Sequence, residues 1–190
     1  MRYPNSPTLD LLVLFGVVFV VQQVGGGVGL GTAWFALATP GSRPWTVLTT
    51  VYAHASVGHL LANAVALGIV GIALEQFTTR ARFHAFVLVT GMLAALTEWL
   101  VGVLLGTPVA VLGASGAILA LYGYVLAGNP ITEGVVGVVE LGRHAKILLV
   151  VGVAFVLTIV TAGPGVALVA HFTGFSLGLV AGNRRLLRVS

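Results

Sequence analysis

The stretch VLGASGAILALYGYVLAGNP, residues 111–130, places Ser115 between two glycines at the start of an apolar run that closes on helix-breaking residues. From Ser115 to Ala127 the run spans thirteen residues, which form about 20 Å of helix at about 1.5 Å per residue. A membrane core is about 30 Å thick, so a membrane helix this short starts below the outer face. Residues 107–113 are then expected to dip into the membrane as irregular backbone, which is tolerated only inside protein or beside a water-filled cavity.

The composition predicts an all-α polytopic membrane protein. Of its 190 residues, 58% are hydrophobic and 7% are charged, whereas soluble domains carry about 25% charged residues. The 26 glycines favour close packing of membrane helices. The chain has no cysteine, which excludes disulfides, thiolate metal ligands and a cysteine nucleophile.

The apolar runs predict six transmembrane helices in a single domain over residues 1–190. They are expected at about residues 11–24, 56–76, 83–105, 115–127, 147–161 and 166–179. The first follows MRYPNSPTLD, which has one arginine, and no A-x-A-like cleavage site comes after it. It is therefore predicted to be a retained helix and not a signal peptide.

Lysine and arginine predict the orientation, because cytoplasmic loops of membrane proteins carry an excess of both. With a cytoplasmic N-terminus, only Arg43 lies outside. The basic residues on the inner side are then Arg2, Arg80, Arg82, Arg143, Lys146, Arg184, Arg185 and Arg188. This bias accounts for the net charge of +4 without nucleic acid as a partner. Abundant valine, alanine, glycine and arginine indicate a GC-rich prokaryote, whose plasma membrane would hold the chain with both termini cytoplasmic.

Three polar side chains from separate helices are expected at one depth. Counted from AGPG, which precedes the sixth helix, His171 lies about 9 Å below the outer face. Counted back from the inner end of the second helix, Asn63 lies about 10 Å below the same face, with His59 a few ångström above Asn63. Together with Ser115 they bring a hydroxyl, an imidazole and an amide to one level. Polar groups at such depth are expensive and favour a functional role.

This set of groups fits nucleophilic catalysis. A serine becomes a nucleophile when a positioned base takes its proton, and His171 is the histidine at matching depth. The oxyanion formed on attack needs preorganised donors. His59 and Asn63, spaced i and i+4, share a helix face and can supply them. The backbone N–H of Ser115, near a helix N-terminus, adds another donor.

Small residues predict a close approach between the helices that carry Ser115 and His171. Gly174 and Gly178 follow His171 at i+3 and i+7 and form a GxxxG surface on its face. The facing helix carries small residues at Gly116, Ala120 and Gly123. Gly113 and Gly116 would also let backbone and substrate approach without an intervening Cβ.

Each feature alone also has a non-catalytic interpretation. A serine in a membrane helix usually bonds the carbonyl one turn back, and GxxxG is common in helix packing. His54, His59 and Asn63 could line a proton or metal path, although histidines without a nearby carboxylate or thiolate make a poor zinc site. Glu98, about fifteen residues into the third helix, lies near the same depth and is predicted to be structural, paired with a hydroxyl or backbone group.

Three separated motifs resemble the rhomboid intramembrane serine proteases. HASVGHLLAN is similar to their H-x4-H-x3-N pattern, GASG to their G-x-S-G, and AHFTGFSLG to their A-H-x2-G-x3-G. PWTVLTTVYAH resembles the outer loop that precedes the paired histidines. The order of the motifs and the six-helix count agree over nearly the whole chain. The resemblance implies a dyad of Ser115 and His171, without an acid, a cofactor or a metal.

The resemblance also implies roles for other residues. The oxyanion hole would consist of His59, Asn63 and the serine amide, and the enzyme would cleave transmembrane segments of membrane-protein substrates near the outer face. His54 would support the loop, and Glu75 resembles the family's glutamate at the inner end of the second helix, which has a packing role.

Two positions depart from the pattern. Bacterial members often carry tyrosine four residues after the serine, stacked on the catalytic imidazole, where this chain has Leu119, with Tyr122 further on. Thr46 follows Trp45, where an arginine is frequent, so the outer loop is expected to be anchored differently. The departures bear on rate, dyad geometry and substrate preference.

The sequence thus predicts a rhomboid-type intramembrane serine endopeptidase. The fifth helix or the TPVAVLG loop would admit the substrate. One alternative is an inactive relative that binds transmembrane segments without cutting them. Another is a small transporter or proton channel in which His54, His59, His171 and Glu98 form a relay, and it predicts no effect of Ser115→Ala.

Overall fold

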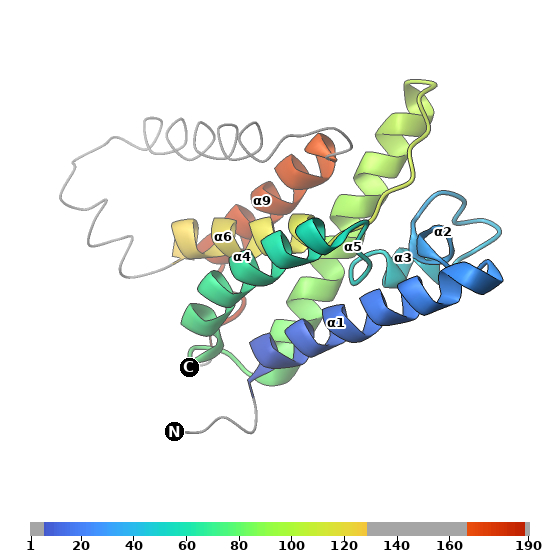
Figure 1. The fold of residues 1–190 in the computed structure, drawn as a ribbon. Helices are drawn as coiled ribbons and strands as arrows, with labels where there is room; N and C mark the ends of the chain where they lie inside the picture. The colour runs from blue at the N-terminus through green and yellow to red at the C-terminus, as the bar shows by residue number, and fades with distance from the viewer. Residues whose placement is uncertain (1–5, 129–166, 189–190) are drawn as a thin grey trace.

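The computed structural model describes residues 6–128 and 167–188 (Figure 1). The long helices in these ranges are α1 (Pro7–Gly25), α4 (Val57–Glu75), α5 (Arg80–Leu104), α6 (Ser115–Gly128) and α9 (Leu168–Asn183). A 3₁₀ turn (Gly26–Val28) and the one-turn helices α2 (Thr32–Phe35) and α3 (Thr46–Thr49) lie between α1 and α4. The helix expected at 147–161 lies outside the described residues, so the described part does not test the count of six spans.

Hydroxyl side chains begin the three longest helices. Ser6, Ser56 and Thr79 each accept a hydrogen bond from a backbone N–H in the first turn of α1, α4 and α5, respectively. Such caps satisfy amide groups that have no partner inside the helix. Because Ser6 caps the helix and Pro7 fits its first turn, α1 begins ahead of the expected start at residue 11.

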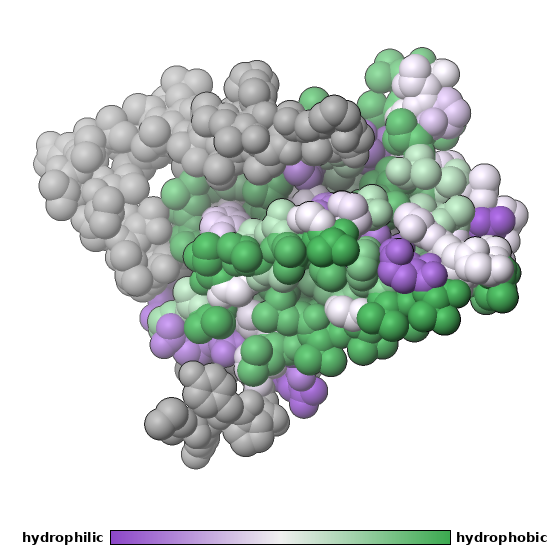
Figure 2. Space-filling view, in the orientation of Figure 1, coloured by the Kyte–Doolittle hydropathy of each residue, from purple (hydrophilic) through white to green (hydrophobic). Residues whose placement is uncertain are grey.

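Three helices are long and apolar enough to cross a membrane: Pro7–Val28, Val57–Glu75 and Arg80–Leu104. Two shorter apolar helices, α6 and α9, accompany them. Helix α4 shows why this is a membrane protein, because one entire side of it is apolar and exposed. That side consists of Val57, Leu61, Val65, Ile69 and Ile72. Figure 2 shows hydrophobic surface continuing over α1 and α4, as expected where helices face lipid.

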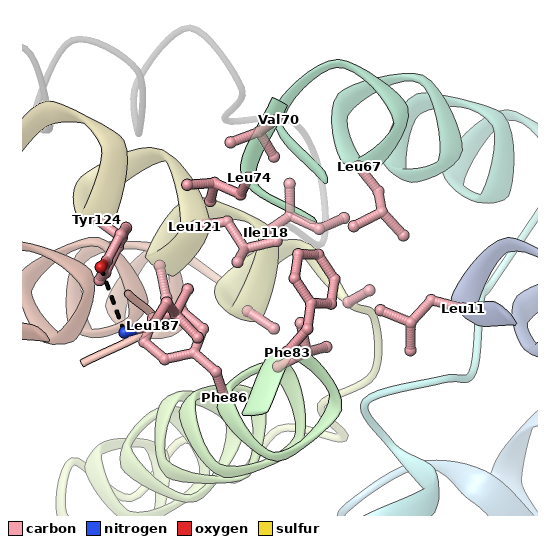
Figure 3. Packing of buried hydrophobic residues seen from close by; sticks show 14 of the residues in the cluster. Leu11, Leu67, Val70, Leu74, Phe83, Phe86, Ile118, Leu121, Tyr124 and Leu187 are labelled. Atoms are coloured by element: carbon pink, nitrogen blue, oxygen red, sulfur yellow. Dashed lines mark hydrogen bonds between the residues drawn. The ribbon is translucent and has the colours of Figure 1, made fainter. Parts of the chain in front are cut away.

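Helix α6 occupies the centre of the packed core and contacts α4, α5 and α9. Its side chains Ile118 and Leu121 meet Leu67 of α4 and Phe83 of α5 in one buried cluster (Figure 3). Tyr124, one turn further along α6, accepts a hydrogen bond from the backbone N–H of Leu187. The short central helix is thus enclosed by protein, which allows irregular backbone before it.

Polar contacts join the helices at one end of the bundle. Glu75, at the end of α4, accepts hydrogen bonds from the Ser6 hydroxyl and the backbone N–H of Thr8, which agrees with the packing role expected for it. Asp10 of α1 pairs with Arg80 of α5 at 2.7 Å. These contacts tie the start of α1 to the turn between α4 and α5.

At the opposite end, the segment before α6 is held by the loop between α1 and α4. Leu37 and Val111 exchange two backbone hydrogen bonds as an isolated antiparallel bridge. Thr50 donates from its hydroxyl to the Val111 carbonyl, and the N–H of Gly113 donates to the Thr50 carbonyl. The irregular backbone that leads into Ser115 therefore has fixed hydrogen-bond partners.

Candidate active site

Ser115 and His171 are in hydrogen-bond contact, with Oγ of the serine 2.7 Å from Nε2 of the histidine. Ser115 is the first residue of α6, and His171 lies in the first turns of α9, 56 residues later in the chain. The histidine is buried, whereas the serine is partly exposed. The hydroxyl can donate to a neutral imidazole nitrogen at this distance, and the exposed side leaves room for a reactant.

The two helices come together through backbone contacts at glycines. A side chain added at Gly174 would overlap the carbonyl group of Gly116, and one added at Gly178 would overlap the carbonyl of Ala120. These are the small residues that the GxxxG pattern pointed to. Their contact brings His171 within reach of the hydroxyl.

His59 of α4 lies against the glycine that precedes the serine. Gly113 has a φ of +124°, and a Cβ built on it would lie 2.7 Å from Cε1 of His59 and 3.9 Å from Oγ of Ser115. Nδ1 of His59 accepts a hydrogen bond from the N–H of Ala55, so the hydrogen of a neutral ring is on Nε2. The partly exposed ring of His59 thus provides an N–H donor beside the glycine that precedes Ser115 by two residues.

Asn63 lies one turn beyond His59 on α4 and is buried. Its Nδ2 donates to the backbone carbonyl of His59 at 3.0 Å, which fixes the amide and leaves a second N–H hydrogen for another acceptor. The contacts described in the structure join Asn63 to His59 and include none with Ser115. The structure therefore brings Ser115, His171 and His59 into one neighbourhood and attaches Asn63 to it through α4.

His54 is fully buried behind His59, with their ring centroids 5.2 Å apart. Its Nδ1 donates to the Tyr52 carbonyl, and the Gln22 side chain bonds both its backbone N–H and its carbonyl. Burial and the neighbouring His59 lower the pKa of His54 from 6.5 to about 4. A neutral, doubly anchored His54 suits a supporting role and not proton exchange with solvent.

The sequence patterns do not single out Gln22 or Thr50, although both hold the site. Gln22 of α1 is buried and clamps the loop that carries His54. Thr50 fixes the backbone before Gly113. For Gln22, the sequence did offer a signal, which is an amide side chain inside an apolar run. A buried polar side chain in a membrane helix needs a hydrogen-bond partner.

The two residues that depart from the expected motif, Leu119 and Thr46, are both buried in the structure. Leu119 packs with Phe175, one turn beyond His171 on α9, while the hydroxyl of Tyr122 donates to the Ala66 carbonyl of α4. Thr46 is buried and donates to the carbonyl of Arg43 within the loop between α1 and α4. This threonine anchors the loop to its own backbone.

Within residues 6–128 and 167–188, no cluster of three or more histidine, cysteine, aspartate or glutamate side chains could hold a metal. The chemistry available to these residues is that of a hydroxyl nucleophile next to an imidazole base. As the first residue of α6, Ser115 has a backbone N–H without an acceptor in its own helix. That N–H and the partial positive charge of the helix end favour a negative charge beside the serine.

A family model described as the rhomboid domain matches residues 41–187. The match covers more than half of the chain and includes all three motifs. A comparison with curated proteins gives no significant match.

Proposed function

Since the chain belongs to the rhomboid family, we propose that it is an intramembrane serine endopeptidase that cleaves transmembrane segments of other membrane proteins. The observation that carries the proposal is the 2.7 Å contact between Oγ of Ser115 and Nε2 of His171. Two helices distant in sequence deliver a nucleophile and a base in direct contact, with the hydroxyl partly exposed. Neither helix packing nor a satisfied core histidine requires this pairing.

In the first step, Oγ of Ser115 attacks the carbonyl carbon of the scissile peptide bond while Nε2 of His171 takes the hydroxyl proton. The carbonyl oxygen of the substrate becomes a tetrahedral oxyanion. When the intermediate collapses, the carbon–nitrogen bond breaks and His171 gives the proton to the leaving nitrogen. The serine is then esterified, and a water molecule that gives a proton to the same imidazole attacks the ester carbonyl. When the bond from the carbonyl carbon to Oγ breaks, His171 returns the proton to Ser115 and the acid product leaves.

The oxyanion is assigned to three donors. They are Nε2–H of His59, the free amide hydrogen of Asn63 and the backbone N–H of Ser115. The hydrogen bonds that His59 and Asn63 make on their other sides support this assignment, because they hold both side chains before the substrate arrives. Preorganised donors stabilise the charge that develops without reorganising during the reaction.

The same proposal includes the membrane setting. The chain lies in a prokaryotic plasma membrane with cytoplasmic termini, because that orientation keeps the basic residues inside. Cleavage then takes place near the outer face, where water reaches the partly exposed Ser115. The substrate enters past the helix expected at residues 147–161 or past the TPVAVLG loop, residues 107–113.

A fluorophosphonate probe tests the nucleophile directly, because it forms a covalent bond with an activated serine and does not modify ordinary serine hydroxyls. The purified protein in detergent is treated with the probe as wild type, Ser115→Ala and His171→Ala. Ser176→Ala, on α9, is the control for loss of a hydroxyl. His84→Ala is the control for loss of an imidazole, because His84 pairs with Asp10 at the far end of the bundle.

The protease proposal predicts labelling of wild type and both controls at Ser115, and loss of labelling in the two site variants. An unlabelled, folded wild type would favour an inactive binder of transmembrane segments. A transporter or proton channel would show flux in liposomes that Ser115→Ala leaves unchanged.

A further inference from the structure

We infer that Glu98 of α5 is a positioning residue for the reaction, which caps helix α9 from outside and thereby places His171 against Ser115. The inference rests on the proposed function of that pair. It concerns a side chain that neither the dyad nor the oxyanion donors include.

Helix α9 begins without a capping side chain of its own. Its N-cap residue is Ala167, which makes no side-chain hydrogen bond to the first turn. The first backbone N–H groups of a helix need acceptors from elsewhere, and in a membrane protein an unpaired one costs more than in water. Oε2 of Glu98 accepts a hydrogen bond from the N–H of Ala170 at 2.8 Å. Glu98 therefore replaces the missing cap from a different helix.

The position of Glu98 on α5 links this cap to the serine as well. Ala94 lies one turn earlier on α5, and a Cβ built on Gly116 would be 2.8 Å from the Cβ of Ala94. Gly116 is the residue that follows Ser115. One side of α5 thus contacts the start of α6 through Ala94 and the start of α9 through Glu98. The same helix therefore fixes the positions of both segments that carry the reacting groups.

The cap acts on the reaction because Ala170 immediately precedes His171. A movement of the first turn of α9 carries the imidazole with it, and the 2.7 Å contact with Ser115 leaves little tolerance. A misplacement of about 1 Å can lower a rate by about a hundredfold. A carboxylate at this place also interacts favourably with the partial positive charge of the helix N-terminus. The contact that the structure describes for this side chain is with the backbone of Ala170, so its effect on the reaction passes through His171.

Two conservative variants separate the reach of the acceptor from its charge. Glu98→Gln keeps an oxygen at the same distance and removes the charge, whereas Glu98→Asp keeps the charge and withdraws the oxygen from Ala170. Thr97→Ala is the matched control, because Thr97 is the preceding residue of α5 and its hydroxyl donates to the Leu93 carbonyl of the same helix. Both Glu98 variants are close in size to the native residue, which favours folding.

The full-length protein in liposomes is assayed for kcat and KM with a fluorogenic single-span substrate, alongside the rate of fluorophosphonate labelling. Glu98→Asp is expected to lower kcat and the labelling rate by about tenfold or more with KM little changed. Glu98→Gln and Thr97→Ala are expected to stay within about threefold of wild type. Hydrogen–deuterium exchange of the first turn of α9 is expected to accelerate in Glu98→Asp alone.

Equal activity of wild type and Glu98→Asp would overturn the inference, as would a loss in Glu98→Gln as large as that in Glu98→Asp. A rise in KM at constant kcat would also overturn it, because it would indicate a role in substrate binding. If the wild type itself were neither labelled nor active, the proposed function would fail. Exchange at the start of α9 would then still report whether Glu98 caps the helix.

Discussion

Gly174 of α9 packs directly against the backbone carbonyl of Gly116 of α6, with no space for a side chain between the two helices. His171 lies one turn before the first of these glycines, and Ser115 is the residue before the second. A close approach of the two helices therefore lies beside the hydrogen bond between serine and histidine. This contact therefore contributes both to the separation of α6 and α9 and to the geometry of the proposed dyad.

Gly174→Ala is expected to separate the two helices and to slow fluorophosphonate labelling of Ser115 by about tenfold or more. The new methyl group overlaps the Gly116 carbonyl, and such overpacking costs about 1–3 kcal/mol. Gly68→Ala is the control, because a Cβ on Gly68 of α4 meets nothing within 4 Å. Labelling of Gly174→Ala at the wild-type rate would contradict this account of the packing.

Gly113→Ala is expected to reduce labelling by displacing His59 and the backbone before Ser115. A Cβ on Gly113 would lie 2.7 Å from Cε1 of His59, and its φ of +124° is unfavourable for alanine. Gly106→Ala is the control for a methyl group added at a positive φ away from the site, because Gly106 has a φ of +70° and its Cβ would meet nothing within 4 Å. If both variants lost the same activity, contact with His59 would not be the reason.

Gln22→Leu is expected to destabilise the protein, because it leaves the N–H and the carbonyl of His54 buried without partners. Each unsatisfied group costs about 1–3 kcal/mol, so the melting temperature in detergent should fall clearly. Gln23→Leu is the matched control, since Gln23 is the exposed neighbour on α1. A similar melting temperature for both variants would show that the clamp contributes little.

His54 is expected to make the protein less stable as the pH falls. Burial next to His59 lowers its pKa to about 4 in the folded protein, whereas the pKa of an exposed histidine in the unfolded chain is 6.5. Between these values the unfolded chain binds more protons than the folded one. The free energy of unfolding therefore decreases with falling pH by up to about 1.4 kcal/mol per unit, and the effect fades out above pH 6.5 as the unfolded chain also loses the proton.

Melting temperatures across this pH window check the expectation. His54→Gln should flatten the dependence in proportion to the contribution of this side chain. An unchanged slope would assign the pH dependence to other groups.

The sequence predicts what depends on local pattern. The apolar runs correspond to helices α1, α4, α5, α6 and α9 to within a few residues at most ends. The largest differences are four residues, at the start of α1 and at the end of α9. At the start of α1, the polar sequence after Ser6 forms the first turn because of its cap and Pro7. The GxxxG spacing predicts the contact of α9 with α6, because small residues at this spacing let two helix backbones approach closely.

Such patterns do not predict which distant residue a side chain or an irregular segment contacts. The depth of Glu98 could be counted, but its direction toward the start of α9 is a property of how three helices pack. The bridge between Leu37 and Val111 joins irregular segments that have no periodicity. The clamp of Gln22 on His54 is likewise visible only once α1 and the loop before α4 are placed together.

The most direct test of the account is cleavage of a single-span membrane protein in proteoliposomes, with the cut site located by mass spectrometry. Wild type, Ser176→Ala and His84→Ala are predicted to cut the substrate within its transmembrane segment. Ser115→Ala and His171→Ala are predicted to leave it intact. Cleavage that persists in Ser115→Ala, or a folded wild type that leaves every tested transmembrane substrate intact, would contradict the assignment as an intramembrane serine protease.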